Sequence, residues 1–255
     1  MLVLFLLVTK NMENIDNTLR KYAEQYETKD FLPADPSRFM HQVVGRENQE
    51  TTAFIASCLS YGSRKQFMPK IQYIIDVAGN DVYNWVKSGS FAHDIPDDGA
   101  CFYRLYTRHT MHALLSALRQ MLDEYGSIGN YVKSRATDGF TAVKAITDYF
   151  ASKGIETIIP KNTNSACKRV CMFLRWMARD DSPVDLGLWK DFIDKRTLII
   201  PMDTHVMQEA NRLGLINNKT ASMAAARKLT QRLAETFPDD PLKGDFALFG
   251  YGVNS

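Results

Sequence analysis

The sequence predicts an all-α protein, with helices packed around one core. Along most of its 255 residues, apolar side chains recur every three or four positions, the spacing that places them on one face of a helix. Strand-like alternation with a period of two is nearly absent. Residues 198–200 form an apolar run, but it is too short to build a sheet.

Each predicted helix is a periodic apolar segment, and several end at a glycine. The predicted helices cover residues 12–26, 51–61, 67–77, 114–125, 140–150, 165–178, 186–193, 204–213, 220–237 and a last short segment from Asp245. The segment 51–61 is apolar and rich in small residues, which is typical of a central helix packed on all sides. Gly62, Gly126 and Gly154 follow three of the segments, because glycine readily adopts the left-handed conformation that ends a helix.

Composition and charge narrow the class of protein. The chain is 45% hydrophobic and carries 31 basic against 29 acidic side chains, so its net charge is only +2. That balance argues against a nonspecific nucleic-acid coat protein, although a local basic face is compatible with it. We expect one helical unit over residues 12–255, in two lobes that face a cleft, and a packed tail or an upstream start over residues 1–11. The apolar stretch 1–8 is too short to span a bilayer, so we expect a cytoplasmic protein with no membrane partner.

No motif indicates a metal or a cofactor. The four cysteines are Cys58, Cys101, Cys167 and Cys171. They are too few for a disulfide framework, and we expect buried reduced thiols. His109 and His112 lie three positions apart, but no carboxylate pair completes a metal site. Glycine-rich phosphate loops and nucleophile turns are also missing, so the sequence predicts neither a metal nor a cofactor.

Two segments carry candidate catalytic residues. A polar turn leads into a helix that carries Lys168, and the turn consists of Lys161, Asn162, Thr163, Asn164 and Ser165. Further along, Pro201-Met202-Asp203-Thr204-His205-Val206 opens another helix. A carboxylate at a helix N-terminus is kept ionised by backbone N–H groups and by the helix dipole. Taken singly, Asp203 could also be an ordinary N-cap and Lys168 an ordinary surface lysine.

Together these segments resemble the helix-hairpin-helix (HhH-GPD) DNA glycosylase superfamily. The stretch 201–206, followed by Arg212-Leu213-Gly214-Leu215, is similar to the active-site stretch of that superfamily. Lys168 followed by Phe173-Leu174-Arg175 resembles the lysine-bearing helix of archaeal-type 8-oxoguanine DNA glycosylase/lyases. Residues 245–248 are similar to the start of their closing helix, and residues 52–60 to their first core helix. The chain as a whole resembles a bacterial family that belongs beside these enzymes, and the resemblance covers residue 51 to the end.

The resemblance implies a two-lobed all-α glycosylase fold and a base-excision activity on damaged double-stranded DNA, with oxidised purines as a candidate lesion. In such enzymes the matching lysine, here Lys168, attacks the sugar C1′, expels the damaged base and forms a Schiff base that permits strand cleavage. The matching aspartate, here Asp203, stabilises the positive charge that develops on the sugar. The basic neighbour Arg169 would favour the unprotonated amine that attack requires. A monomer is expected.

The hairpin departs from the pattern of that superfamily. Its members carry Gly-x-Gly-x-Lys, whereas Asn164 and Ala166 stand at the glycine positions here. Asn164 can adopt a left-handed conformation, but Ala166 does so only at a cost. We therefore expect a reshaped hairpin that contacts a DNA phosphate through residues 161–165 and Arg169. The five basic residues between 161 and 179, with no acidic residue among them, favour such an anion-binding face.

Two further departures concern an insertion and a wedge residue. Lys168 and Asp203 are farther apart in sequence than in the relatives, and the surplus in residues 180–196 includes a predicted amphipathic helix. Trp189 and Phe192 would share one face of it, which favours shielding of the core over narrowing of a cleft. A glutamine that fills the gap left by a flipped base in relatives is absent, so Tyr61 or Arg64 is the candidate wedge, unless the protein has none.

These departures leave two alternatives to an enzyme. The first is a non-catalytic helix-hairpin-helix protein that binds DNA without cutting it, which would explain the lost hairpin glycines. The second is a role unrelated to nucleic acid on the same fold, because fold alone does not dictate function.

Overall fold

The computed structural model describes residues 2–254, with side chains for residues 13–252. The α-helices are α1 (Leu2–Tyr26), α2 (Arg46–Leu59), α3 (Arg64–Val77), α4 (Val82–Ser88), α5 (Phe91–Asp94), α6 (Arg108–Tyr125), α7 (Ile128–Arg135), α8 (Gly139–Ser152), α9 (Lys168–Ala178), α10 (Thr204–Arg212), α11 (Met223–Thr236) and α12 (Lys243–Asn254). Three short 3-10 helices are η1 (Lys29–Ala34), η2 (Pro36–His41) and η3 (Lys195–Thr197). The prediction of a helical protein is confirmed.

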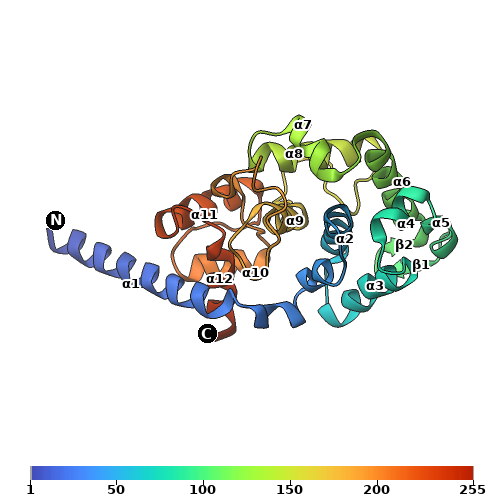
Figure 1. Ribbon diagram of the computed structural model, residues 1–255. Coiled ribbons are helices and arrows are strands. Elements are labelled where there is room, and N and C mark those ends of the chain that lie inside the picture. The colour runs from blue at the N-terminus through green and yellow to red at the C-terminus, as the bar shows by residue number, and fades with distance from the viewer. Residues whose placement is uncertain (1, 255) are drawn as a thin grey trace.

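The described residues contain one small sheet, which the periodicity did not reveal. Strands β1 (Cys101–Tyr103) and β2 (Tyr106–Thr107) form an antiparallel hairpin ahead of α6. Strands of three and two residues are too short to produce a recognisable alternation. The hairpin lies beside α3, α4 and α5 in Figure 1.

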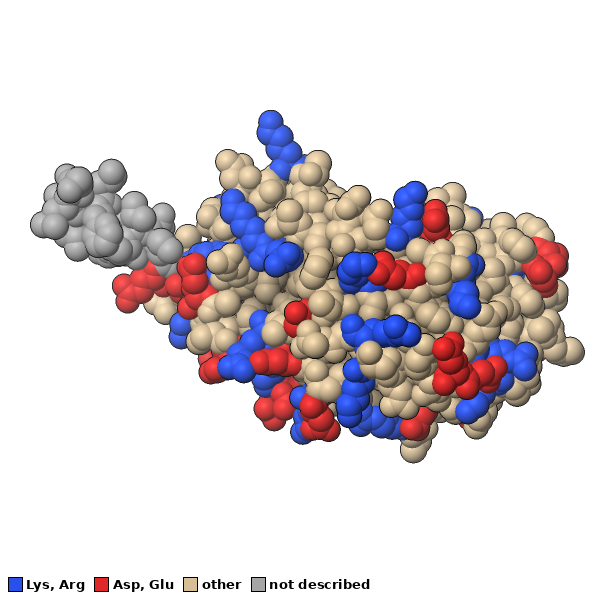
Figure 2. Space-filling view, turned by 90° about the horizontal axis from the view of Figure 1, so that it is seen from above, with Lys and Arg blue, Asp and Glu red and all other residues tan. Residues whose placement is uncertain are grey.

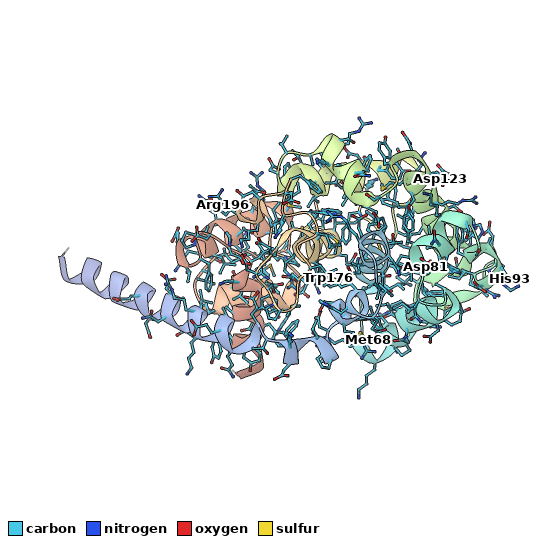
Figure 3. The ribbon with its side chains drawn as sticks, viewed as in Figure 1. Met68, Asp81, His93, Asp123, Trp176 and Arg196 are labelled. Atoms are coloured by element: carbon cyan, nitrogen blue, oxygen red, sulfur yellow. The ribbon has the colours of Figure 1, made fainter. Side chains whose placement is uncertain are left out.

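Helices α2 and α9 occupy the middle of the molecule. They pack against each other, with α10–α12 on one side of the pair and α3–α6 on the other (Figure 1). Phe54 of α2 stacks on Phe150 of α8 at 5.2 Å between ring centroids and meets Phe173 of α9 edge-on at 5.3 Å. All residues of α2 from Thr51 to Leu59 are buried, as expected for a central helix. Trp176 of α9 is likewise interior, whereas His93 and Arg196 lie at the periphery (Figure 3).

The predicted helix over residues 186–193 is wrong, because the structure has turns there. Trp189 is fully buried in these turns and meets Phe173 edge-on at 5.2 Å. Its indole Nε1 donates to Glu50 Oε1 at 2.6 Å. The segment is therefore held by a side chain of α2 from more than a hundred residues away, and it covers the core as the shielding interpretation expected.

Two smaller predictions also need correction. Cys58, Cys167 and Cys171 are buried free thiols, as expected, but Cys101 in β1 is exposed. The backbone of α1 is continuous from Leu2, so no helix boundary falls at Met12. Whether the side chains of residues 1–11 form a packed tail lies outside the described residues. None of the described helices is both long and apolar enough to cross a membrane.

Glu50 is a buried carboxylate that joins three segments. Besides the indole of Trp189, it accepts the backbone N–H groups of Ile128 at 2.8 Å and Gly129 at 3.0 Å, at the N-terminus of α7. Gly129 is required here, since a Cβ atom at this position would lie 2.6 Å from Glu50 Oε1. Burial raises the pKa of Glu50 to about 6, although these three hydrogen bonds and Arg46 oppose the rise.

The raised pKa of Glu50 predicts a pH dependence of stability. The folded state binds this proton more tightly than the unfolded chain, so the contribution of Glu50 to the free energy of unfolding falls as the pH rises through the interval from 4.5 to about 6. We expect the wild type to lose about 2 kcal/mol more than Glu50→Gln between pH 4.5 and pH 7. Urea unfolding of both proteins at the two pH values measures this difference, and equal losses would contradict it.

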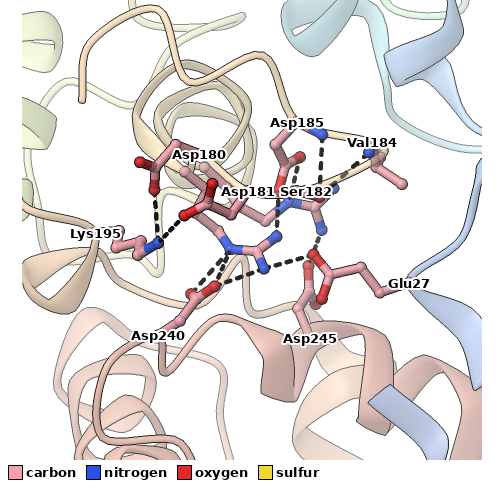
Figure 4. Close-up of polar contacts among 11 residues, drawn as sticks. Glu27, Asp180, Asp181, Ser182, Val184, Asp185, Lys195, Asp240 and Asp245 are labelled. Carbon is pink, nitrogen blue, oxygen red and sulfur yellow. Dashed lines mark hydrogen bonds and ion pairs between the residues drawn. The ribbon is translucent and has the colours of Figure 1, made fainter. Parts of the chain in front are cut away.

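A network of buried ion pairs joins α1, α9, α12 and the loops beside them (Figure 4). Arg179 is fully buried, and it pairs with Asp240 at 2.8 Å, with Glu27 at 2.6 Å and with Asp185. Arg175, one turn earlier in α9, pairs with Asp185 at 3.3 Å and with Asp245. Every charge in this cluster has an opposite partner, which is the condition under which buried charges are tolerated.

Candidate active site

Asp203 is the N-cap of α10, as its position before Thr204 predicted. Its backbone is extended, and its Oδ1 accepts the backbone N–H of Val206 at 2.9 Å. Partial burial tends to raise the pKa of Asp203, but the charge and hydrogen bond of Lys168, together with the Val206 N–H, lower it overall. The carboxylate is therefore kept in its ionised form.

Lys168 is the first residue of α9, and its Nζ donates to Asp203 Oδ2 at 2.7 Å. The two residues are 35 positions apart in sequence. Both side chains are partly open to solvent, with 39% of Lys168 and 38% of Asp203 exposed. The fold thus brings together the two residues that the sequence singled out, and it leaves both accessible.

The lysine–aspartate pair lies at a pocket of about 250 Å³. Phe31 of η1 and Phe246 and Phe249 of α12 form an aromatic wall, in which Phe31 meets each of the other two rings edge-on at 5.1 Å. Asp35, Arg175 and Asp245 supply charge to the lining. Apolar walls with a few polar groups are the usual composition of a small-molecule site.

Asp245 is a functional candidate that the sequence did not single out. The sequence assigned it only to the start of a closing helix, but it lines the pocket and pairs with the buried Arg175. Burial raises the pKa of Asp245, although Arg175 and Lys168 oppose the rise. The pocket therefore contains two carboxyl groups with opposite pKa shifts, Asp203 lowered and Asp245 raised, an arrangement that is common in catalytic sites.

The turn before α9 is strained at a residue that the sequence did not indicate. Neither Asn164 nor Ala166 has a positive φ, so the expected cost at Ala166 does not arise. Cys167, directly before Lys168, is instead left-handed at φ 47° and ψ 37°. A non-glycine residue in that conformation costs roughly 1–2 kcal/mol. The buried Cys167 side chain points back into the turn, where its Sγ lies 3.5 Å from the carbonyl oxygen of Asn162.

The predicted phosphate-binding turn lies at the surface but is only partly free. Lys161, Asn164 and Ser165 are exposed, whereas Asn162 and Thr163 are half-buried. The Asn162 side chain accepts the backbone N–H of Asn164 at 3.0 Å, and Ser165 forms a bridge to Ser222. These residues are on one surface turn that leads directly into Lys168.

The predicted basic face is wrong for two of its five members, because Arg175 and Arg179 are buried in the ion-pair network. Arg169 is half-buried, and its Nη1 donates to the carbonyl of Cys58 at 2.8 Å and to the hydroxyl of Tyr106. Lys161 is exposed and Lys168 is partly exposed. On the face drawn in Figure 2, Lys and Arg side chains are interspersed with Asp and Glu and do not form a single basic patch.

The two wedge candidates occupy different environments. The ring of Tyr61 packs against Tyr103 at 5.5 Å and Tyr106 at 5.3 Å, and its hydroxyl is buried. Tyr61 therefore does not project from the surface. Arg64 is exposed in the first turn of α3, and it lines the pocket with its guanidinium 5.9 Å from the ring of Phe249.

Fold and site together define a helical protein with a lysine–aspartate pair at the mouth of a partly aromatic pocket. The chain belongs to the family DUF2400, described as a protein of unknown function, whose family model matches residues 35–254. That range includes Lys168, Asp203 and Asp245 but not α1 or Phe31. Comparisons with curated proteins and with solved structures give no match.

Proposed function

We propose that this protein is a DNA base-excision glycosylase with abasic-site lyase activity, built on an HhH-GPD-like fold. The proposal depends on one observation, the 2.7 Å contact between Lys168 Nζ and Asp203 Oδ2 beside the pocket. An amine and an ionised carboxylate at this distance, both reachable from solvent, are the two groups that the chemistry needs. The sequence resemblance supplies the reaction class.

In the proposed reaction, the unprotonated Lys168 amine attacks C1′ of the damaged nucleoside. The bond between Nζ and C1′ forms, the glycosidic bond breaks, and its electron pair leaves with the base, which takes up a proton. Opening of the sugar ring, in which the ring oxygen takes up a proton, then gives a Schiff base. Loss of a C2′ proton and departure of the 3′ phosphate as the leaving group cleave the strand. The ionised Asp203 stabilises the positive charge at C1′ and accepts a hydrogen bond from the Lys168 amine before attack.

The pocket would accept the base after it has left the duplex stack. Flipped bases are held by stacking on aromatic rings and by hydrogen bonds to their edges. Phe31 and Phe249 provide apolar surface, and the carboxyl groups of Asp35 and Asp245 provide acceptors. These residues come from η1, η2's N-cap and α12, so the base would lie between the N-terminal and C-terminal segments of the chain.

Borohydride trapping tests the proposal directly. The full chain is incubated with duplexes that contain an abasic site, 8-oxoguanine or another damaged base, and borohydride reduces any Schiff base to a stable amine. We expect a covalent protein–DNA adduct on at least the abasic-site duplex. The absence of an adduct on the entire panel would contradict the proposal.

Asp203→Asn is expected to slow base release while keeping the attacking amine. Loss of one preorganised charge-stabilising group typically lowers a rate by about 10²–10³-fold. We expect a decrease of that size in single-turnover excision from a lesion duplex. Asp194→Asn is a matched control, because Asp194 is also the N-cap of a helix but pairs with Arg196 at the surface. Equal rates in the two variants would count against the role of Asp203.

A further inference from the structure

Leu105 stands at the tip of the β1–β2 hairpin with 83% of its surface exposed. Among the described residues, the other exposed large hydrophobic side chains are Val44 and Tyr73. Arg104, beside Leu105 in the tight turn, is left-handed at φ 52°, a conformation that is uncommon for a non-glycine residue. The tip is therefore a sharp turn that exposes the side chain of Leu105 to solvent.

The hairpin tip is held firmly in place. The guanidinium of Arg104 lies 4.9 Å from the ring of Tyr61, and it also closes against Gly62, where a Cβ atom would lie 2.4 Å from Arg104 Nη1. The hydroxyl of Tyr103 donates to the backbone carbonyl of Tyr61. These contacts of Tyr103 and Arg104 hold the turn that carries Leu105.

The same hairpin is braced against the helix that carries Lys168. Tyr106, next to Leu105, accepts a hydrogen bond from Arg169, and Arg169 follows Lys168 in the first turn of α9. Arg169 also binds the carbonyl of Cys58 near the end of α2. One arginine thus connects the hairpin, the end of α2 and the start of α9.

Basic side chains lie on α3, the helix beside the hairpin (Figure 1). Arg64 and Lys65 are exposed in the first turn of α3, a turn that contains no acidic residue. Lys70 Nζ lies 5.3 Å from the ring of Phe102 in β1. At the base of the hairpin, the carboxylates of Asp98 and Asp97 are paired with Arg108 and His109. The surroundings of Leu105 are therefore suited to a polyanion that also offers an apolar surface.

We propose that Leu105 is the wedge that enters the base stack of DNA beside the extruded nucleotide, while Arg104 and the first turn of α3 contact the flanking phosphates. This inference rests on the proposed function. Apolar side chains such as leucine unstack base steps when proteins insert them into a duplex, and basic side chains bind the backbone next to them. The hairpin thus takes the place proposed for Tyr61, whose ring packs against Tyr103 and Tyr106 and whose hydroxyl is buried.

The test uses a duplex with 2-aminopurine next to a tetrahydrofuran abasic analogue, which cannot form a Schiff base. The fluorescence of 2-aminopurine rises when its stacking is disturbed. We expect the full wild-type chain to produce a rise and Leu105→Ala to produce one about tenfold smaller, since alanine is too short to enter the stack. Leu105→Met, which keeps the length and the apolar character, is expected to restore the rise.

Val44→Ala is the matched control. Val44 is 90% exposed, but it precedes α2, whereas the hairpin contacts Tyr61, just after the opposite end of that helix. We expect Val44→Ala to behave as the wild type. No rise with the wild type, or an equal rise with Leu105→Ala, would overturn the assignment of the wedge.

Failure of the wedge can be distinguished from failure of the glycosylase proposal. Borohydride trapping of the wild type on a preformed abasic site requires no base to be extruded, so it reports on the Schiff base independently of the wedge. Trapping that persists while the fluorescence prediction fails would exclude the wedge alone. Trapping that fails in the wild type would exclude the enzyme.

Discussion

Replacing Lys168 by glutamine is expected to abolish the borohydride adduct on DNA with an abasic site. A carboxamide nitrogen cannot form an iminium with C1′, so the loss should be at least about 10³-fold, as for other covalent nucleophiles. The fold should persist, because Lys168 is partly exposed and Asp203 retains its hydrogen bond from Val206. Quantification of the cross-linked band after electrophoresis measures the effect.

Lys195→Gln provides the matched control. Lys195 Nζ forms an ion pair of similar length, 2.6 Å, with Asp180 Oδ1, but it does not line the pocket. We expect Lys195→Gln to form the adduct at wild-type yield. An adduct that survives in Lys168→Gln would place the nucleophile elsewhere. Salt-sensitive DNA binding in the wild type without any adduct would favour the non-catalytic binding protein.

Replacing Arg179 by methionine is expected to lower the free energy of unfolding by about 3–5 kcal/mol, the usual cost of removing one member of a buried ion pair. The substitution leaves Asp240, Asp185 and Glu27 around a neutral side chain, and Asp185 retains only Arg175. Because methionine fills much of the space, the expected decrease in the free energy of unfolding comes mainly from the loss of the positive charge. Urea unfolding at neutral pH measures the difference.

Arg196→Met controls for the loss of an arginine as such. Arg196 pairs with Asp194 at 2.6 Å, but its side chain is 63% exposed. Surface pairs contribute about 0–1 kcal/mol, so the variant should unfold close to the wild type. If both variants lost the same stability, burial of the network would not be the source of its effect.

The helical class could be predicted because it depends on local spacing. Helices α2, α3, α6, α8, α10 and α11 each lie within a few residues of their predicted ranges. The segment 186–193 has the apolar spacing of a helix but is not one. Its conformation depends on the bond between Trp189 and Glu50, and no local pattern reveals a partner so far away in the chain.

The Lys168–Asp203 pair could be predicted because each residue belongs to a short motif at a helix start. Which basic residues of the turn and of α9 are exposed could not be predicted in the same way. In the sequence, Arg175 and Arg179 look equivalent to Lys161, because several partners of these buried arginines lie far away at Glu27, Asp240 and Asp245. The strain at Cys167 and the exposed position of Leu105 also required the path of the backbone.

The part of the chain that the family model covers does not coincide with the part that holds the molecule together. Glu27 and Phe31 precede the match, yet one neutralises Arg179 and the other closes a side of the pocket. A recombinant fragment trimmed to residues 35–254 would leave an interior guanidinium short of one counter-charge and would open the aromatic wall. A fragment for crystallisation or assays should therefore retain the segment that contains Glu27 and Phe31.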